Sequence, residues 1–114
     1  MKDDGVHVGN VKLGSISHAH SRGELGIMIG DQRARGKGYG KEAIYALAQY
    51  AFESLVLHRV EAGCAELNFA SRDAFLSVGF RVEGRLRSHQ VDVDGKRIDC
   101  LRMGALPGEL REPW

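Results

Sequence analysis

The segment from Gln32 to Gly40 combines three glycines with three cationic side chains within nine residues. Glycine has no Cβ, so backbone N–H groups can converge on one point. A helix that begins at such a turn adds unpaired N–H groups and the positive end of its dipole. The segment therefore predicts a phosphate or pyrophosphate site. A glycine-rich hairpin without a ligand is the alternative.

The glycine spacing separates this turn from two common phosphate motifs. A Walker loop requires GxxxxGK[ST], which the sequence lacks. A dinucleotide fingerprint requires GxGxxG and a carboxylate about 20 residues later. The spacing here is GxGxG, from Gly36 to Gly40. The residues alone thus leave the phosphate ligand open.

Hydrophobic periodicity places the turn between a strand and a helix. The expected elements are a strand over 6–17, a turn over 18–23, a strand over 24–29, a helix over 40–54, a strand over 58–65, a helix from Asn68 that ends before Gly79, and strands over 80–93 and 96–106 joined by an Asp94-Gly95 hairpin. This order predicts an α/β (α+β) fold, with one mixed central sheet and helices as crossovers.

Three motifs in this order resemble the GNAT superfamily of acetyl-CoA-dependent N-acetyltransferases. The first is 35–40, which fits [Q/R]xxGx[G/A]; the second runs from Asn68 through Phe75 to Gly79-Phe80. The third comprises 83–87, the Asp94-Gly95 hairpin and Asp99, which resemble the RimJ/RimL-like branch. The resemblance covers about 8–106. It implies a GNAT acyl-CoA N-acyltransferase fold lacking its first strand and helices, with the domain at 1–106 and a C-terminal tail at 107–114.

The resemblance also implies an acetyl-CoA site. The strand before the glycine turn would splay from its neighbour, and its backbone would pair with the pantetheine arm like an added strand. Asn68 would bond the arm near the thiol, or act as a simple helix N-cap. The implied coenzyme-binding residues are Ile27, Met28, Ile29, Arg35, Gly36, Lys37, Gly38, Tyr39, Gly40, Lys41, Asn68, Ser71, Arg72 and Phe75.

Direct transfer of the acetyl group to an amine is the implied reaction, and it needs a general base. Glu24 stands where family members often carry this base; an exposed strand-end charge is the alternative. A backbone N–H at Met28 or Ile29 would polarise the thioester carbonyl. Phe75 occupies the position where many members have a tyrosine general acid, and it has no proton to give.

The resemblance leaves the acceptor open among an amino-sugar nucleotide, a polyamine and a protein N-terminus. A non-catalytic acetyl-CoA-binding module is the competing function, since the family's first strand and two helices are not matched. An open sheet edge predicts a homodimer, and the tail is expected either to be loose or to dock on a partner subunit.

Composition excludes other classes. The formal net charge of +1 does not indicate a nucleic-acid partner. No apolar run approaches the roughly 20 residues that span a bilayer, so we expect a cytoplasmic protein without a membrane partner. Cys64 and Cys100 are expected as small buried side chains rather than a disulfide. His18 and His20 have no third ligand in sight, so no metal site is expected.

Overall fold

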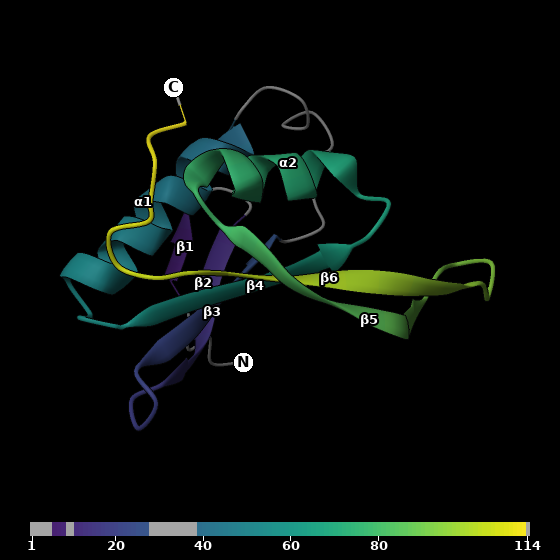
Figure 1. Ribbon diagram of the computed structural model, residues 1–114, viewed down its shortest axis with the longest axis horizontal. Helices are drawn as coiled ribbons and strands as arrows, with labels where there is room; N and C mark the ends of the chain where they lie inside the picture. Colours follow the sequence, from purple (N-terminus) through teal and green to yellow (C-terminus); the bar gives the residue numbers. More distant parts are fainter. Residues whose placement is uncertain (1–5, 9–10, 28–38, 114) are drawn as a thin grey trace.

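The computed structural model describes residues 6–8, 11–27 and 39–113 (Figure 1). Its elements, in order, are β1 (Val6–Val8), β2 (Val11–Ser17), β3 (Arg22–Ile27), α1 (Tyr39–Glu53), β4 (Arg59–Ala65), α2 (Phe69–Val78), β5 (Arg81–Val91) and β6 (Arg97–Ala105). Apart from the first strand, the expected order of helices and strands is confirmed, and so is the α/β class.

The strands form one mixed sheet in the order β1-β2-β3-β4-β6-β5. Only the β3–β4 pair is parallel; every other neighbouring pair is antiparallel. A parallel pair needs a crossover, and α1 lies in the connection between β3 and β4. Helices α1 and α2 pack against each other (Figure 1). The long β5–β6 ribbon extends past them.

The first expected strand is divided in two, so the prediction of one strand over 6–17 was wrong. β1 and β2 pair antiparallel, with Val8 opposite Val11. The two strands are separated in the sequence by Gly-Asn, a dipeptide typical of tight hairpins. Apolar residues alternate on both sides of this dipeptide, Val6 and Val8 before it and Val11 and Leu13 after it, which is why periodicity alone suggested a single strand.

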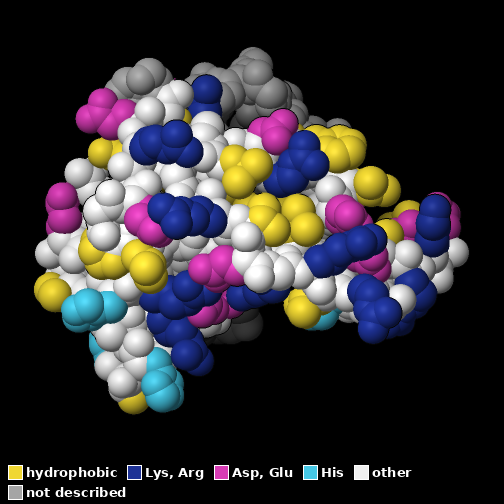
Figure 2. Space-filling model, in the orientation of Figure 1, with side chains coloured by type: hydrophobic (Ala, Val, Ile, Leu, Met, Phe, Trp, Pro, Cys, Tyr) yellow, Lys and Arg dark blue, Asp and Glu magenta, His cyan; other side chains and the backbone are white. Residues whose placement is uncertain are grey.

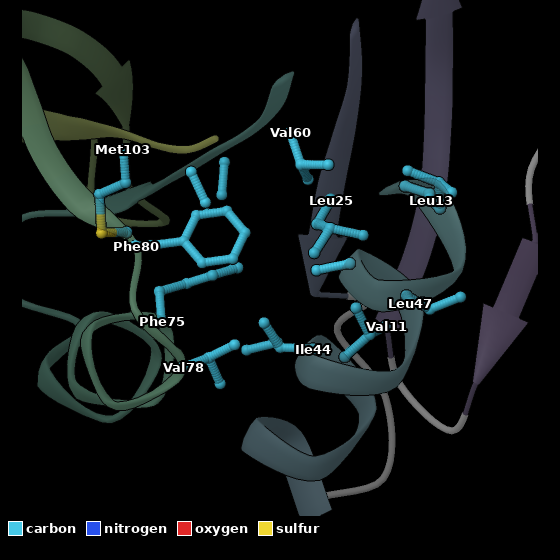
Figure 3. Close-up of a cluster of buried hydrophobic side chains, with 14 of the residues drawn as sticks. Val11, Leu13, Leu25, Ile44, Leu47, Val60, Phe75, Val78, Phe80 and Met103 are labelled. Carbon is cyan, nitrogen blue, oxygen red and sulfur yellow. The ribbon is translucent and has the colours of Figure 1, made fainter. Parts of the chain in front are cut away.

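The hydrophobic core lies between the sheet and the two helices. The apolar stripe expected for α1 is buried, with Ile44, Leu47, Ala48 and Ala51 each at most 1% exposed. Figure 3 shows Ile44 between Val78 of α2 and the side chains from β2 and β3. Each large apolar side chain buried in this way stabilises the fold by roughly 1.5–3 kcal/mol. No helix in the described part of the chain is long and apolar enough to cross a membrane.

Both ends of α2 have the caps that the sequence predicts. Asn68 Oδ1 accepts a hydrogen bond from the backbone N–H of Ser71 at 3.2 Å. Gly79 ends the helix in the left-handed conformation, with φ of 108°. An N-cap of this kind stabilises a helix by about 1 kcal/mol, so these two residues fix where α2 starts and stops.

The C-terminal tail packs on its own chain, which neither expectation for it described. The backbone N–H of Arg111 donates to the carbonyl of Val78 at 2.7 Å. Glu109 pairs with Arg81 at 3.1 Å. A Cβ at Gly79 would lie 2.2 Å from the carbonyl oxygen of Glu109. Glycine at position 79 therefore serves both the left-handed turn and the close approach of the tail.

Replacing Gly79 by alanine is expected to lower the free energy of unfolding by more than the same change at Gly95. Both glycines have positive φ, but a Cβ at Gly95 meets nothing within 4 Å. Left-handed strain alone costs roughly 1–2 kcal/mol. Urea denaturation should show that loss for Gly95→Ala and a larger one for Gly79→Ala, which also displaces the tail. Equal losses would contradict the docked tail.

Candidate functional site

The parallel pairing between β3 and β4 stops before either strand ends. Register runs from Arg22 opposite Arg59 to Leu25 opposite Ala62. β3 continues to Ile27 and β4 continues to Ala65. Beyond Leu25, β3 pairs with β2; beyond Ala62, β4 pairs with β6. The two strands thus diverge, as the resemblance implies. Beyond this point their facing backbone edges form no hydrogen bonds with each other.

Both helices begin near this divergence. α1 follows β3 in the chain and α2 follows β4, and the two strands run in the same direction. Their carboxyl ends therefore lie at the same edge of the sheet, where ligands bind in many α/β proteins. Unpaired N–H groups of both first helical turns lie on this side. Unpaired strand edges with two helix starts on the same side suit an extended ligand that carries phosphates.

Much of the predicted coenzyme site lies outside the described residues. This holds for Met28, Ile29, Arg35, Gly36, Lys37 and Gly38, whose roles stay predictions. Among the described residues, Ile27 is the last of β3, and Tyr39, Gly40 and Lys41 form the start of α1. Their contacts with a coenzyme stay predictions.

The start of α2 supplies the other predicted coenzyme residues. Asn68 is exposed and caps the helix, whereas Ser71 is 8% exposed. The Arg72 guanidinium lies 4.6 Å from the centre of the Phe69 ring and 3.3 Å from an oxygen of Asp73. The N-cap role of Asn68 is confirmed; contacts of Asn68, Ser71 and Arg72 with a coenzyme stay predictions.

Phe75 belongs to the hydrophobic core. Its side chain is 1% exposed and packs edge-to-face on Phe80, with ring centres 5.2 Å apart. Figure 3 shows the two rings together beside Met103 and Val78. The ring offers no proton to a leaving group. Its contact with the coenzyme stays a prediction.

Glu24 lies on the sheet face opposite the core, within a row of alternating charges. Its Oε2 is 3.4 Å from Nη1 of Arg102 on β6. Arg102 Nη2 lies 3.5 Å from Oε2 of Glu61 on β4. Arg59 Nε donates to Glu61 at 2.8 Å, and its two terminal nitrogens contact both oxygens of Glu83 on β5. We call these five side chains the charge row; the row spans four neighbouring strands.

Electrostatics within the charge row follow from this pairing. The hydrogen bonds that Arg59 donates to Glu83, and then to Glu61, raise the pKa of Arg59 above its usual value. The hydrogen bond from Arg59 lowers the pKa of Glu83. Opposite charges at hydrogen-bonding distance favour both charged forms. Figure 2 likewise shows acidic and basic side chains intermixed, not separated by sign, on the face in view.

Sequence reasoning found Glu24 but missed the other members of the charge row. A signal was present in two glycines that interrupt β4 and β6, because glycine inside a strand often marks close approach of another group. A Cβ at Gly104 would lie 2.7 Å from Glu83 and 2.8 Å from Arg59. Which side chain crosses which glycine depends on strand register, and the sequence alone does not supply it.

The third motif of the resemblance has a structural role in the β5–β6 ribbon. Asp99 accepts the backbone N–H of Ser88 at 2.7 Å and a guanidinium N–H of Arg85 at 2.5 Å. Ser88 has a φ of 53°, and the register shifts between Leu86 and Gln90. The Ser88 hydrogen bond, with Arg85 nearby, lowers the pKa of Asp99. Asp99 therefore stabilises a bulge in the edge strand.

The two cysteines and the two histidines of the turn between β2 and β3 lie in different surroundings. Cys64 and Cys100 are free thiols, half-buried and buried respectively, and burial raises the pKa of each. His18 and His20 are exposed in the turn between β2 and β3. Within the described residues no group of three His, Cys, Asp or Glu side chains could hold a metal ion.

Comparison with known proteins identifies the family. The model for the Acetyltransferase (GNAT) domain matches residues 1–81. The solved structure of a probable acetyltransferase superposes with a TM-score of 0.78 at 31% identity, over 85% of this chain and 54% of that one. A spermidine N-acetyltransferase variant from Vibrio cholerae gives 0.76 at 29% identity, over 84% and 56%. The chain belongs to the GNAT acetyltransferase family.

Curated relatives agree with this assignment. Spermidine N(1)-acetyltransferase from Escherichia coli K12 is 31% identical over 88% of this chain and 53% of its own length. A putative ribosomal N-acetyltransferase from Bacillus subtilis is 34% identical over 93% and 57%. An uncharacterized N-acetyltransferase from Bacillus licheniformis is 31% identical over 96% and 60%. The chain thus spans between half and three fifths of the length of these relatives.

Glu83→Gln is expected to lower the free energy of unfolding at pH 7 by at most about 1 kcal/mol, because Glu83 is partly exposed. The pKa of Glu83 is lowered in the folded state. Its contribution is therefore complete above the ordinary glutamate pKa and is lost as the pH falls through the lowered one. Urea unfolding of a double-mutant cycle with Arg59→Met should show coupling at pH 7 that is lost at a pH low enough to protonate Glu83 in the folded protein. Equal coupling at both values would contradict the ion pair.

Proposed function

We propose that this chain binds acetyl-CoA, with the pantetheine arm lying in the gap between β3 and β4. The observation that carries the proposal is the end of pairing at Leu25 and Ala62. An extended arm with two amide groups can form hydrogen bonds with exposed strand edges, as peptides do when they add to a sheet. Membership of the GNAT family supports the choice of this coenzyme.

Described residues on each side of the gap suit such a ligand. Gly26 is exposed, and a Cβ there would meet nothing within 4 Å, so the backbone is open to close approach. Asn68 uses Oδ1 for the helix cap, and its NH₂ group has the donors that would bond the arm. The first turn of α1 provides backbone N–H groups for the pyrophosphate.

We further propose direct acetyl transfer to a primary amine. The thioester supplies the activated acetyl group when the coenzyme is bound. Glu24, next to the last paired residue of β3, would accept the proton of the amine, directly or through water. The departing thiolate needs no acid from Phe75, because a thiol of pKa near 8.5 is a tolerable leaving group.

The charge row bears on the class of acceptor. Glu24, Glu61 and Glu83 are each paired with an arginine, so this face offers a polycation no unpaired carboxylate within the row. This favours an amino-sugar nucleotide or a protein N-terminus over a polyamine. Spermidine is the acceptor named for the Escherichia coli relative, so it remains the comparison compound. A homodimer and a cytoplasmic location also stay predictions.

A coenzyme-binding module without turnover is the second candidate function. Phe75 favours it, because it lies in the core and carries no donor where many members have a tyrosine. Binding of acetyl-CoA is common to both functions; release of free thiol distinguishes them.

Amide NMR should locate the arm in the gap. On addition of acetyl-CoA we expect large shift changes for the backbone amides from Gly26 to Ile27 and from Gly63 to Ala65. Adenosine 3′,5′-bisphosphate lacks the arm and should leave these amides unchanged while perturbing the start of α1. Identical responses to the two ligands would contradict the proposed placement.

A thiol-release assay tests transfer. With acetyl-CoA and a panel of amino-sugar nucleotides, N-terminal peptides and spermidine, we expect thiol release with at least one primary amine. Glu24→Gln should lower kcat by about 100-fold or more, within the range for a general base, and leave acetyl-CoA binding intact. Coenzyme binding without release on any amine would leave the module as the function.

A further inference from the structure

Arg102 reaches Glu24 by crossing an intervening strand. Arg102 is on β6 and Glu24 on β3, and β4 lies between these strands. Residue 63 of β4 is directly opposite Arg102 in the register. The guanidinium nevertheless comes within 3.4 Å of the Glu24 carboxylate. Something at position 63 must therefore allow the side chain to pass.

Glycine at position 63 leaves this path open. A Cβ there would lie 2.6 Å from Arg102 Nη1. Non-bonded carbon and nitrogen atoms clash at this distance. The guanidinium is the flexible end of the Arg102 side chain, so it can move more easily than the backbone. A methyl group at position 63 would consequently move the guanidinium rather than the strand. Gly63 therefore keeps the line between Arg102 and Glu24 free.

A second carboxylate contacts the guanidinium through its other terminal nitrogen. Arg102 Nη2 is 3.5 Å from Glu61, which Arg59 binds in turn at 2.8 Å. Two carboxylates on adjacent strands thus restrain one planar group. Side chains of Arg102 and Glu24 are still 32% and 40% exposed, so a ligand can reach the carboxylate.

We propose that Arg102 is the positioning residue of the Glu24 base and that Gly63 is required for it. This inference rests on the proposed acetyl transfer. The guanidinium holds the carboxylate in one orientation at the end of the β3–β4 pairing, where the amine would approach. Arg102 itself forms no bond to substrate; its effect acts through Glu24.

Four variants test this role. Arg102→Met removes the charge and keeps the length, Arg102→Lys restores a cation, and Gly63→Ala blocks the path. Gly84→Ala is the matched control, because Gly84 is opposite Arg102 on β5 and a Cβ there meets nothing within 4 Å. Each variant is assayed for kcat and for acetyl-CoA affinity on the best amine. Its melting temperature is also recorded.

Misplacement of a catalytic group by about 1 Å can cost up to 100-fold in rate. We expect Arg102→Met and Gly63→Ala to lower kcat by about 10-fold or more, with acetyl-CoA affinity unchanged. Arg102→Lys should recover part of the loss, and Gly84→Ala should match the wild type. A purely structural role would instead lower the melting temperature and leave kcat of the folded protein unchanged.

A second readout does not depend on turnover. The side-chain carboxyl ¹³C signal of Glu24 should shift in Arg102→Met and in Gly63→Ala, but not in Gly84→Ala. An unchanged signal in the first two variants would overturn the contact itself. If the wild type turns over and Arg102→Met has the same kcat, only the positioning role would be overturned. Absence of turnover in the wild type would overturn the proposed transfer, and the positioning role with it.

Discussion

Parallel pairing that stops at Leu25 and Ala62 is the constraint on which the site depends. A strand edge without a partner loses hydrogen bonds that are costly to leave unmade, at about 1–3 kcal/mol for each buried group. The gap persists because each strand is held on its outer edge, β3 by β2 and β4 by β6. These antiparallel ladders keep the inner edges apart. Water or an extended ligand must then satisfy them.

In β3 and β4, the side chains that form the core and the side chains that form the charge row alternate along the strand. Leu25 and Val60 face the helices and are fully buried. Their neighbours Glu24, Arg59 and Glu61 face the other way and form part of the charge row. Successive side chains in a strand point to opposite faces, so a one-residue slip in register would exchange the two sets. The buried face therefore fixes the register that the charged face requires.

Most of the helices and strands could be predicted from short-range features of the sequence. Caps at Asn68 and Gly79, the apolar stripe of α1 and the Asp94-Gly95 hairpin each act within a few residues, so the sequence predicts them. Glu24 and the gap came from the family resemblance. The Arg102 contact, the crossing at Gly63 and the docked tail join residues far apart in sequence, and only strand register brings them together. Periodicity did not predict the division into β1 and β2, because apolar residues alternate in both strands.

The order of the strands in the sheet has a consequence for folding during synthesis. β6 comes last in sequence, yet it lies between β4 and β5 in the sheet. During synthesis, β5 leaves the ribosome before the strand that it must pair with exists. The carbonyl of Val78 likewise has no hydrogen-bond donor in Arg111 until the tail has been synthesised. Strands β1 to β4 can pair in the order in which they are synthesised, whereas β5 joins the sheet only when β6 pairs with both β4 and β5. A nascent chain halted before Arg97 would therefore have β5 without its strand partner.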